Sequence, residues 1–252
     1  SLVVAADGSR AVVRDQAGIE ADPIGYEEVA ITAVMTTQRF HDYVAYERFT
    51  QEGPIAILPL TDGRCGMVWT RKPAEVERML ALSDDEFLRE FQSAFGFRLG
   101  RFLRIGQRAS YNLMLSRADR HIAQRLAVVG NAAQGLHPIA GQGFNLGLRD
   151  AMSLAEVIAD RRAAGTTDPG DANLLQEYAD WRETDRRRIV AFTDGLVRLF
   201  ATPLGVLRSL RSLGILAFDV LPPAKSALAR LSVGAAERVP RLARGVPLAG
   251  IR

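Results

Sequence analysis

The chain has little of what would mark a secreted, metal-binding or membrane-spanning protein. Its single cysteine, Cys65, cannot form an internal disulfide, and no cysteines and histidines cluster with the spacing of a metal site. The longest nearly uncharged apolar stretch, residues 213–218, is far shorter than the roughly 20 apolar residues of a membrane-spanning helix. An initiator methionine and a secretory leader are also lacking. These absences favour a reducing compartment and a cytoplasmic location.

Aromatic residues are sparse as well, at 7% of the 252 residues, and positive charge is concentrated at one end. Residues 186–252 hold 12 Lys and Arg against 3 Asp and Glu, whereas residues 1–185 hold 20 against 26. Nucleic-acid binding is not expected, because the basic segment has few aromatic side chains for base stacking. Its leucines and arginines predict helices that dock on the inner membrane or on a partner complex, or else a solvated helical bundle.

The remaining patterns predict an α/β (α+β) fold with a mainly antiparallel sheet. An Asp-Gly turn at 61–64 indicates a hairpin, and Ser83 with Glu86 forms a capping box. The compact apolar run 125–129 leads straight into glycine, as a buried parallel strand does. We expect it to share a sheet with the strand at 2–6. The other predicted strands are 26–37, 43–50, 54–60, 65–70 and 101–115, and the predicted helices are 86–95, about 145–164 and several beyond 186.

One glycine-rich stretch, RLAVVGNAAQGLHPIAGQGFNLGLRDAMSLAE at residues 125–156, invites a chemical interpretation. Its strand ends at Gly130, its loop contains Gly141 and Gly143, and a helix is predicted from about Asn145. Backbone amides at a helix N-terminus favour an anion or a polarised carbonyl. The glycines follow G-x-G-x-x-x-G some distance after the strand, unlike the dinucleotide fingerprint. A glycine-rich turn without a ligand is the alternative.

Two separated segments carry a resemblance. AADGSRAVVR (5–14) and VVGNAAQGLHPIAGQGFNLGLRDAMSLAE (128–156) resemble the second and third flavin motifs of the FAD-dependent aromatic-ring hydroxylases. Residues 46–69 and 91–100 resemble the ubiquinone-biosynthesis branch, most closely the 2-polyprenyl-6-methoxyphenol hydroxylases. The resemblance covers nearly the whole chain and is weakest after residue 200.

The resemblance implies a set of cofactor-binding residues. The second motif is expected near FAD and the approaching nicotinamide, and the start of the third near the ribityl and pyrophosphate groups. Asn131 and Gln134 stand where many relatives have aspartate and histidine, but an amide still hydrogen-bonds a ribityl hydroxyl. We expect Asp7 to contact residues 131–145. The implied FAD contacts are Asp7, Gly8, Arg10, Gly130, Asn131, Pro138, Gly141, Gln142, Gly143, Phe144 and Asn145.

The resemblance also implies an activity. FAD reduced by NAD(P)H would bind O2 as a C4a-hydroperoxide and pass oxygen to the ring of a polyprenylated phenol. The helix near Asn145 would stabilise negative charge on the reduced flavin. Ile57, Leu58, Pro59 and His137 are expected in the substrate pocket, with His137 as a general base or as a loop-fixing residue. The alternatives are a related flavin reductase or epoxidase, and a non-enzymatic membrane or complex interaction module.

Relatives of this kind begin with a G-x-G-x-x-G turn that holds the FAD pyrophosphate, and residues 1–252 contain no such turn after a strand. We therefore expect a truncated chain that lacks roughly a hundred residues or more upstream. We expect it to be colourless, free of FAD and inactive. The expected domains are a remnant of the FAD-binding domain at 1–18, a β-sheet substrate domain at 19–115, the second part of the FAD-binding domain at 116–165, and C-terminal helices at 166–252.

Overall fold

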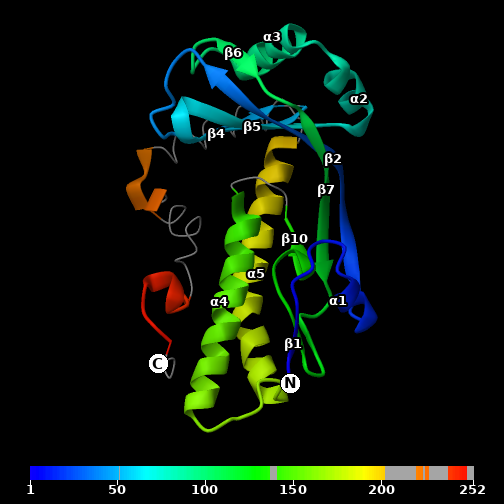
Figure 1. Cartoon of the computed structure of the whole chain (residues 1–252), viewed down its shortest axis with the longest axis vertical. Helices are drawn as coiled ribbons and strands as arrows, with labels where there is room; N and C mark the ends of the chain where they lie inside the picture. Colours follow the sequence, from blue (N-terminus) through cyan, green and yellow to red (C-terminus); the bar gives the residue numbers. More distant parts are fainter. Residues whose placement is uncertain (51, 137–140, 202–219, 224, 227–237, 249–252) are drawn as a thin grey trace. The chain divides into compact units, whose positions relative to one another are not determined.

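The computed structural model describes residues 1–50, 52–136, 141–201, 220–223, 225–226 and 238–248, and it divides into two compact units (Figure 1). Unit 1 comprises Ser1–Gly25, Met114–Val197 and Leu204–Arg252, and unit 2 comprises Tyr26–Leu113 and Arg198–Pro203. The predicted division into four domains, with a substrate domain at 19–115, stays a prediction. The described residues 167–197 and 238–248 belong to unit 1.

A three-stranded sheet organises unit 1. Strand β1 (Val3–Ala5) runs parallel to β9 (Leu126–Val128), with Val3 opposite Leu126, and β8 (Ile122–Ala123) pairs antiparallel with β9. The predicted sharing of one sheet by residues 2–6 and 125–129 is confirmed. Both faces of β9 are buried, because Ala127 packs toward one hydrophobic cluster and its neighbours toward another. This two-sided burial explains the unbroken apolar run.

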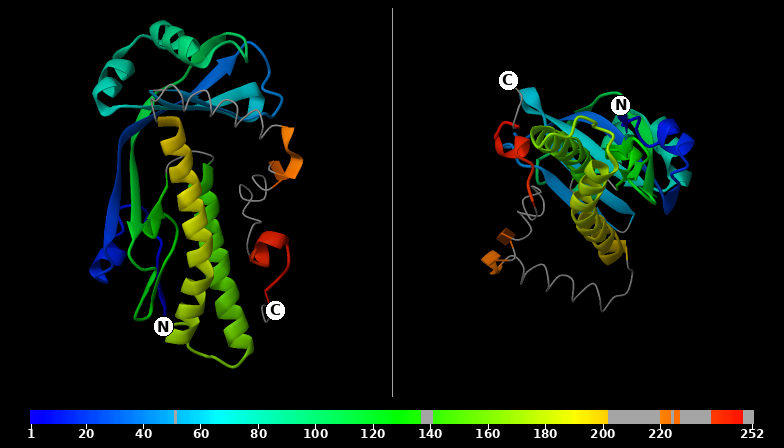
Figure 2. Two further views of the ribbon diagram at one scale, coloured as in Figure 1. Left: turned by 180° about the vertical axis from the view of Figure 1, so that it is seen from behind. Right: turned by 90° about the horizontal axis from the view of Figure 1, so that it is seen from below.

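Two long helices cover one face of this sheet. Helix α4 (Gln142–Ala163) and helix α5 (Ala172–Ala201) lie side by side and antiparallel (Figures 1 and 2). Side chains of both, including Leu154 and Tyr178, pack on Ala127 of β9. Helix α4 begins before the predicted start at Asn145, directly after the glycine-rich loop.

Short elements cover the other face. Helix α1 (Val12–Gln16), the 3-10 turn η2 (Gly130–Ala132) and strand β10 (Gln134–Gly135) contribute to this side of unit 1. Ala11 and Ala132 belong to the cluster that also contains Val128 of β9. The Asp-Gly segment and the start of the glycine-rich stretch therefore share one core.

The second sheet is antiparallel. Besides β10 it contains β2 (Ala21–Thr37), β3 (Tyr46–Thr50), β4 (Gly53–Pro59), β5 (Arg64–Arg71), β6 (Phe102–Ile105) and β7 (Ala109–Ala118). The strand order is β10-β7-β2-β5-β4-β3, with β6 beside β2. Its β10 and the ends of β2 and β7 belong to unit 1. Between β4 and β5 the chain turns through η1 (Thr61–Gly63), where Asp62 has φ of 60°, so the predicted hairpin is confirmed. The predicted strand 101–115 is divided in two.

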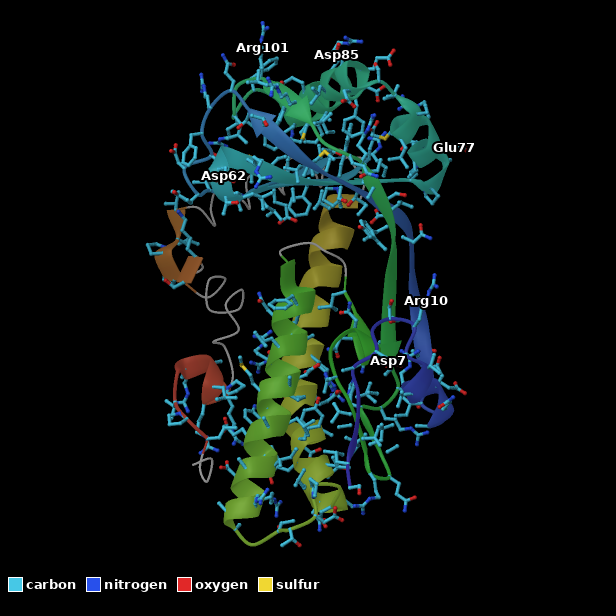
Figure 3. All side chains as sticks on the ribbon, in the orientation of Figure 1. Asp7, Arg10, Asp62, Glu77, Asp85 and Arg101 are labelled. Atoms are coloured by element: carbon cyan, nitrogen blue, oxygen red, sulfur yellow. The ribbon has the colours of Figure 1, made fainter. Side chains whose placement is uncertain are left out.

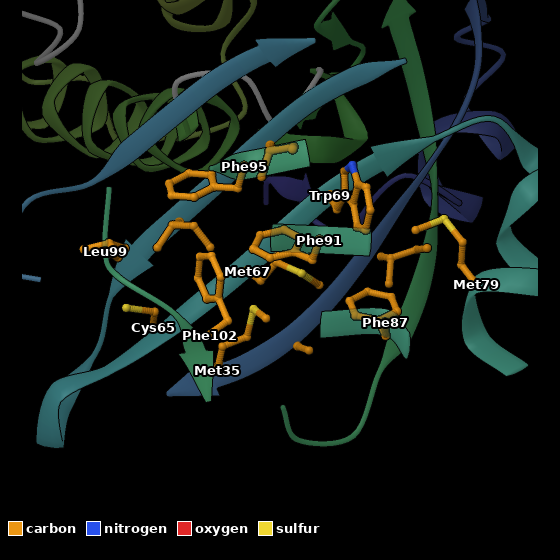
Figure 4. Packing of buried hydrophobic residues seen from close by; sticks show 14 of the residues in the cluster. Met35, Cys65, Met67, Trp69, Met79, Phe87, Phe91, Phe95, Leu99 and Phe102 are labelled. Carbon is orange, nitrogen blue, oxygen red and sulfur yellow. The ribbon is translucent and has the colours of Figure 1, made fainter. Parts of the chain in front are cut away.

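Helices α2 (Pro73–Ala81) and α3 (Asp84–Phe95) supply side chains to the core of unit 2 (Figure 4). The predicted capping box starts α3: the Ser83 hydroxyl accepts from the Glu86 amide, and the Glu86 carboxylate accepts from the Ser83 amide. The apolar stripe of α3, Phe87, Phe91 and Phe95, is fully or almost fully buried. Phe91 meets Trp69 of β5 edge-on, with ring centroids 5.2 Å apart. Aromatic packing therefore joins α3 to the sheet.

The described part of the C-terminal segment, residues 238–248, contacts the helices of unit 1. The buried Glu156 carboxylate accepts from the Arg241 backbone amide at 2.6 Å, and the Trp181 indole donates to the Arg238 carbonyl at 3.1 Å. Within the basic segment 186–252, which is predicted to dock on a membrane or partner, residues 202–219, 224, 227–237 and 249–252 lie outside the described residues, and the docking stays a prediction. None of the described helices is long and apolar enough to cross a membrane.

Candidate functional site

The glycine-rich stretch begins at a close contact between two backbones. Gly130 follows β9 with φ of +62°, a conformation that disfavours a side chain. A Cβ added to Gly147 of α4 would lie 3.0 Å from the Gly130 Cα. This glycine pair lets α4 approach the Gly130–Gly135 turn closely, a packing role that the motif interpretation did not include.

The buried carboxylate of Asp150 binds this turn through hydrogen bonds. Asp150 of α4 is completely buried, and its Oδ2 accepts from the Gly130 amide and from the Gln134 side-chain amide, both at 3.0 Å. Its Oδ1 accepts from Arg182 Nε at 2.8 Å, and Arg186 Nη2 lies 3.3 Å from Oδ2. Burial by itself raises the pKa of Asp150, but Arg186, Arg182 and the hydrogen bonds from Arg182 and Gly130 together lower the pKa below its usual value. The carboxylate is therefore ionised in the folded chain.

The same charged cluster extends along α5. Asp185 pairs with Arg182 at 2.7 Å and with Arg149 at 3.4 Å, and all three side chains are largely buried. The Tyr178 hydroxyl donates to the Val128 carbonyl of β9 at 3.3 Å. Burial raises the pKa of this phenol, and the Asp150 charge raises it further. The cluster thus connects α4, α5 and the end of β9.

His121 lies beside this cluster as a neutral side chain. Its Nδ1 is 4.0 Å from the Glu183 carboxylate, and the side chain is 8% exposed. Burial lowers the pKa of His121 to about 3, and the positive charges of Arg186, Arg117 and Arg182 contribute. The opposing Asp150 charge is too weak to restore the usual value.

The end of the glycine-rich loop is bare. Gly141 precedes α4 in the left-handed conformation with φ of 60°, and a Cβ added to Gly141 or Gly143 would meet no atom of the described residues within 4 Å. Phe144 is 77% exposed, and Asn145 is exposed. The start of α4 therefore presents open backbone to one side. The structure does not describe three of the predicted contacts: His137, Pro138 and the Gln142 side chain.

The Asp-Gly motif lies just before helix α1. Asp7 accepts a hydrogen bond from the Val13 amide at 3.1 Å, and contact between Asp7 and residues 131–145 stays a prediction. Gly8 has φ of +84° and open space where a Cβ would lie. Arg10 is exposed (Figure 3), and the arginine that reaches the turn is Arg14, whose buried guanidinium donates to the Ala132 carbonyl at 3.0 Å. The predicted proximity of Arg10 to FAD stays a prediction.

The residues predicted to line an apolar pocket differ in exposure. Ile57 is completely buried in the core of unit 2, whereas its neighbour Leu58 is 43% exposed, and Pro59 is half-buried. Successive residues of a strand point to opposite faces of the sheet, so Ile57 and Leu58 cannot line the same surface. Of these two residues, only Leu58 is available to a ligand on the open face.

A family model described as FAD binding domain matches residues 1–193. The chain belongs to this family. It is 42% identical to the ubiquinone hydroxylase UbiL of Rhodospirillum rubrum over 250 residues, covering 98% of this chain and 58% of that protein. It is 30% identical to the mitochondrial ubiquinone biosynthesis monooxygenase COQ6 of Caenorhabditis elegans over 265 residues, covering 90% and 58%. The chain thus spans little more than half the length of these relatives.

Solved structures share the fold. The p-nitrophenol 4-monooxygenase PnpA of Pseudomonas putida superposes with a TM-score of 0.72 at 21% identity, over 94% of this chain and 60% of that one. The Diels-Alderase PyrE3 superposes with a TM-score of 0.71 at 21% identity, over 95% and 51%. The folded chain is therefore of the type found in FAD-dependent aromatic hydroxylases.

The residues present fit a flavin cofactor. Open backbone at Gly8, Gly141 and Gly143 leaves space that side chains would fill, and the α4 N-terminus offers amides to an electron-rich group. Among the described residues, no cluster of acidic, histidine or cysteine side chains could hold a metal ion. Sequence reasoning missed the supporting residues Asp150, Arg182 and Arg14. The signal available for Asp150 and Arg14 was their position inside the two quoted motifs.

Alanine substitutions at two glycines of α4, Gly147 and Gly143, are expected to change the free energy of unfolding in opposite directions. Gly147→Ala would place a methyl group against the Gly130 backbone, and we expect it to lower the free energy of unfolding by roughly 1–3 kcal/mol. Gly143→Ala meets open space, so we expect a change within about 1 kcal/mol, toward higher stability. Urea unfolding of both variants checks this. Equal behaviour would show that the glycine contact does not limit packing.

Proposed function

We propose that this chain is the flavin-contacting part of a FAD-dependent monooxygenase of ubiquinone biosynthesis, which hydroxylates the ring of a polyprenylated phenol. The observation that carries the proposal is the bare glycine backbone at the start of α4, in a chain of the FAD-binding family. The names of two relatives, ubiquinone hydroxylase and ubiquinone biosynthesis monooxygenase, support the pathway. A 2-polyprenyl-6-methoxyphenol is the substrate that the sequence resemblance favours.

Several residues of this chain would hold the cofactor. Gly8, Gly141 and Gly143 would admit the flat ring edge, and exposed Asn131 would hydrogen-bond a ribityl hydroxyl as donor or acceptor. The N-terminus of α4 would stabilise negative charge on the ring through its dipole and free amides. When bound, FAD reduced by NAD(P)H supplies the activation of O2 for oxygen transfer to an electron-rich ring. Exposed Leu58 would offer apolar surface to a prenylated substrate.

A backbone NMR titration with FAD tests the proposal on the chain itself. We expect the amide resonances of Gly8, Gly141 and Gly143 to shift as FAD is added. Gly143→Val should abolish the shifts of the Gly8 and Gly141 amides while leaving the fold intact, because the new side chain enters space that the described residues leave open. The matched control is Gly195→Val in α5, which also meets no atom within 4 Å and should bind like the wild type. If FAD leaves all three glycine amides unmoved in the wild type, the proposal fails.

We further predict that the 252-residue chain purifies without stoichiometric FAD. The reason is that residues 1–252 contain no G-x-G-x-x-G turn after a strand, the feature that anchors the pyrophosphate in dinucleotide-binding folds. The remaining contacts at the ring edge are few, so affinity is expected to be weak. Visible absorbance of the purified chain, compared with its protein concentration, gives the answer. A yellow protein with one flavin per chain would contradict this prediction.

A further inference from the structure

We propose that Asp150 is a positioning residue for the bound flavin: its carboxylate holds the Gly130–Gly135 turn in the conformation that faces the cofactor. This inference rests on the proposed function, because it assigns the turn to the cofactor side of the site. Asp150 lies beneath the turn and is completely buried, so it acts through the turn and not by direct contact.

The donors around Asp150 require an acceptor with two equivalent oxygens. The Gly130 amide, the Gln134 side chain and Arg182 donate hydrogen bonds to it at 2.8–3.0 Å. Arg186 adds an ion pair at 3.3 Å. An ionised carboxylate accepts only, whereas the amide of an asparagine carries two donors of its own. Asparagine at this position would therefore turn an N–H group toward another N–H group in a buried site. The hydrogen-bond pattern selects aspartate specifically.

Two of these donors belong to the turn, in which Asn131 is exposed and residues 132–135 are buried. Gly130 and Gln134 bracket the segment, and between them Asn131 is exposed. The Ala133 amide closes the turn by donating to the Gly130 carbonyl at 3.0 Å, and Arg14 donates to the Ala132 carbonyl. Asp150 thus holds both ends of a short turn, Gly130 and Gln134, and the exposed Asn131 lies between these ends.

The same cluster provides a matched control. Asp185 is also a largely buried aspartate paired with Arg182, and it further pairs with Arg149. The hydrogen bonds and ion pairs of Asp185 go to these arginines, whereas those of Asp150 include the turn. Removing either charge disturbs the buried ion pairs, so a general loss of stability would affect both variants alike. Only Asp150→Asn should change the turn.

Two measurements on the full chain separate these effects. The first is amide hydrogen exchange without FAD. We expect Asp150→Asn to speed exchange at Gly130 about tenfold or more relative to the wild type, while Asp185→Asn stays within about threefold. The second is the FAD-dependent shift of the Asn131 amide, whose midpoint should move to about tenfold higher FAD concentration in Asp150→Asn and remain near the wild-type value in Asp185→Asn.

If Asp150→Asn does not fold, Gln134→Met decides the matter. It replaces a neutral buried side chain, removes one turn contact and keeps both ion pairs of Asp150, so a weaker FAD response at Asn131, by about threefold, is expected. Unchanged exchange at Gly130, equal effects of the Asp150 and Asp185 variants, or an unchanged FAD response at Asn131 would each overturn the proposal. The exchange measurement contains no FAD, so it judges the role of Asp150 in the turn even if the wild type binds no FAD and the proposed function fails.

Discussion

Replacement of Arg182 by methionine is expected to lower the free energy of unfolding by roughly 3–5 kcal/mol. The Arg182 side chain is only 1% exposed and neutralises two carboxylates, Asp150 at 2.8 Å and Asp185 at 2.7 Å. Methionine fills similar space but leaves both carboxylates without this partner, and only Arg186 and Arg149 remain to compensate. An uncompensated charge in a buried site costs far more than the intact ion pair contributes to stability.

Arg187→Met is the control for this measurement. Arg187 lies nearby on α5, but its side chain is 70% exposed and its ion pair is with Glu183, four residues earlier. Such surface pairs contribute about 0.3–0.5 kcal/mol, so the control should unfold almost like the wild type. Urea unfolding monitored by Trp181, a residue of unit 1, distinguishes the two variants. Similar stabilities would show that the buried network does not depend on Arg182.

Local signals explain which parts of the fold the sequence could predict. The Ser83 capping box, the turn at Asp62 and the apolar run into Gly130 each depend on neighbouring residues, and all three are confirmed. Helix α2 was missed, although Pro73 at its first position is typical of a helix start. Strand β4 shows a different limit. Its run of apolar residues has no polar alternation, so the sequence could not reveal that Ile57 faces the core and Leu58 the open side.

The candidate site shows the same division. The two glycine-containing motifs predicted the FAD-binding family of the chain, because their glycine spacing is visible in the sequence. The contact between Gly130 and Gly147 was not predictable, since it depends on how α4 packs against the turn. The same holds for Asp150 and Arg182, which are 32 residues apart. Charged residues usually predict solvent-exposed faces, and only the packing of α4 against α5 reveals a buried pair.

The pH dependence of stability should contain a large contribution from His121. In the folded chain the pKa of His121 is about 3, compared with 6.5 for an ordinary histidine. Between these values the unfolded chain binds a proton that the folded chain excludes, so the free energy of unfolding falls as the pH falls below about 6.5. One pKa unit corresponds to 1.36 kcal/mol, so this group alone should remove roughly 2 kcal/mol of stability between pH 6.5 and 5.

Replacing His121 by glutamine isolates that contribution, because glutamine is polar and does not titrate. The wild type and His121→Gln should each be unfolded with urea at several pH values from 7 to 5, and their difference in stability should shift in favour of the variant by roughly 2 kcal/mol across that range. The depressed pKa of Asp150 affects stability only below about pH 5, where its carboxylate begins to be protonated in the unfolded chain, so it does not obscure this window. Contributions from the other histidines are common to both proteins and cancel in the difference. Parallel curves for the two proteins would mean that His121 becomes protonated in the folded chain, with the Glu183 carboxylate close enough to form an ion pair with the imidazolium.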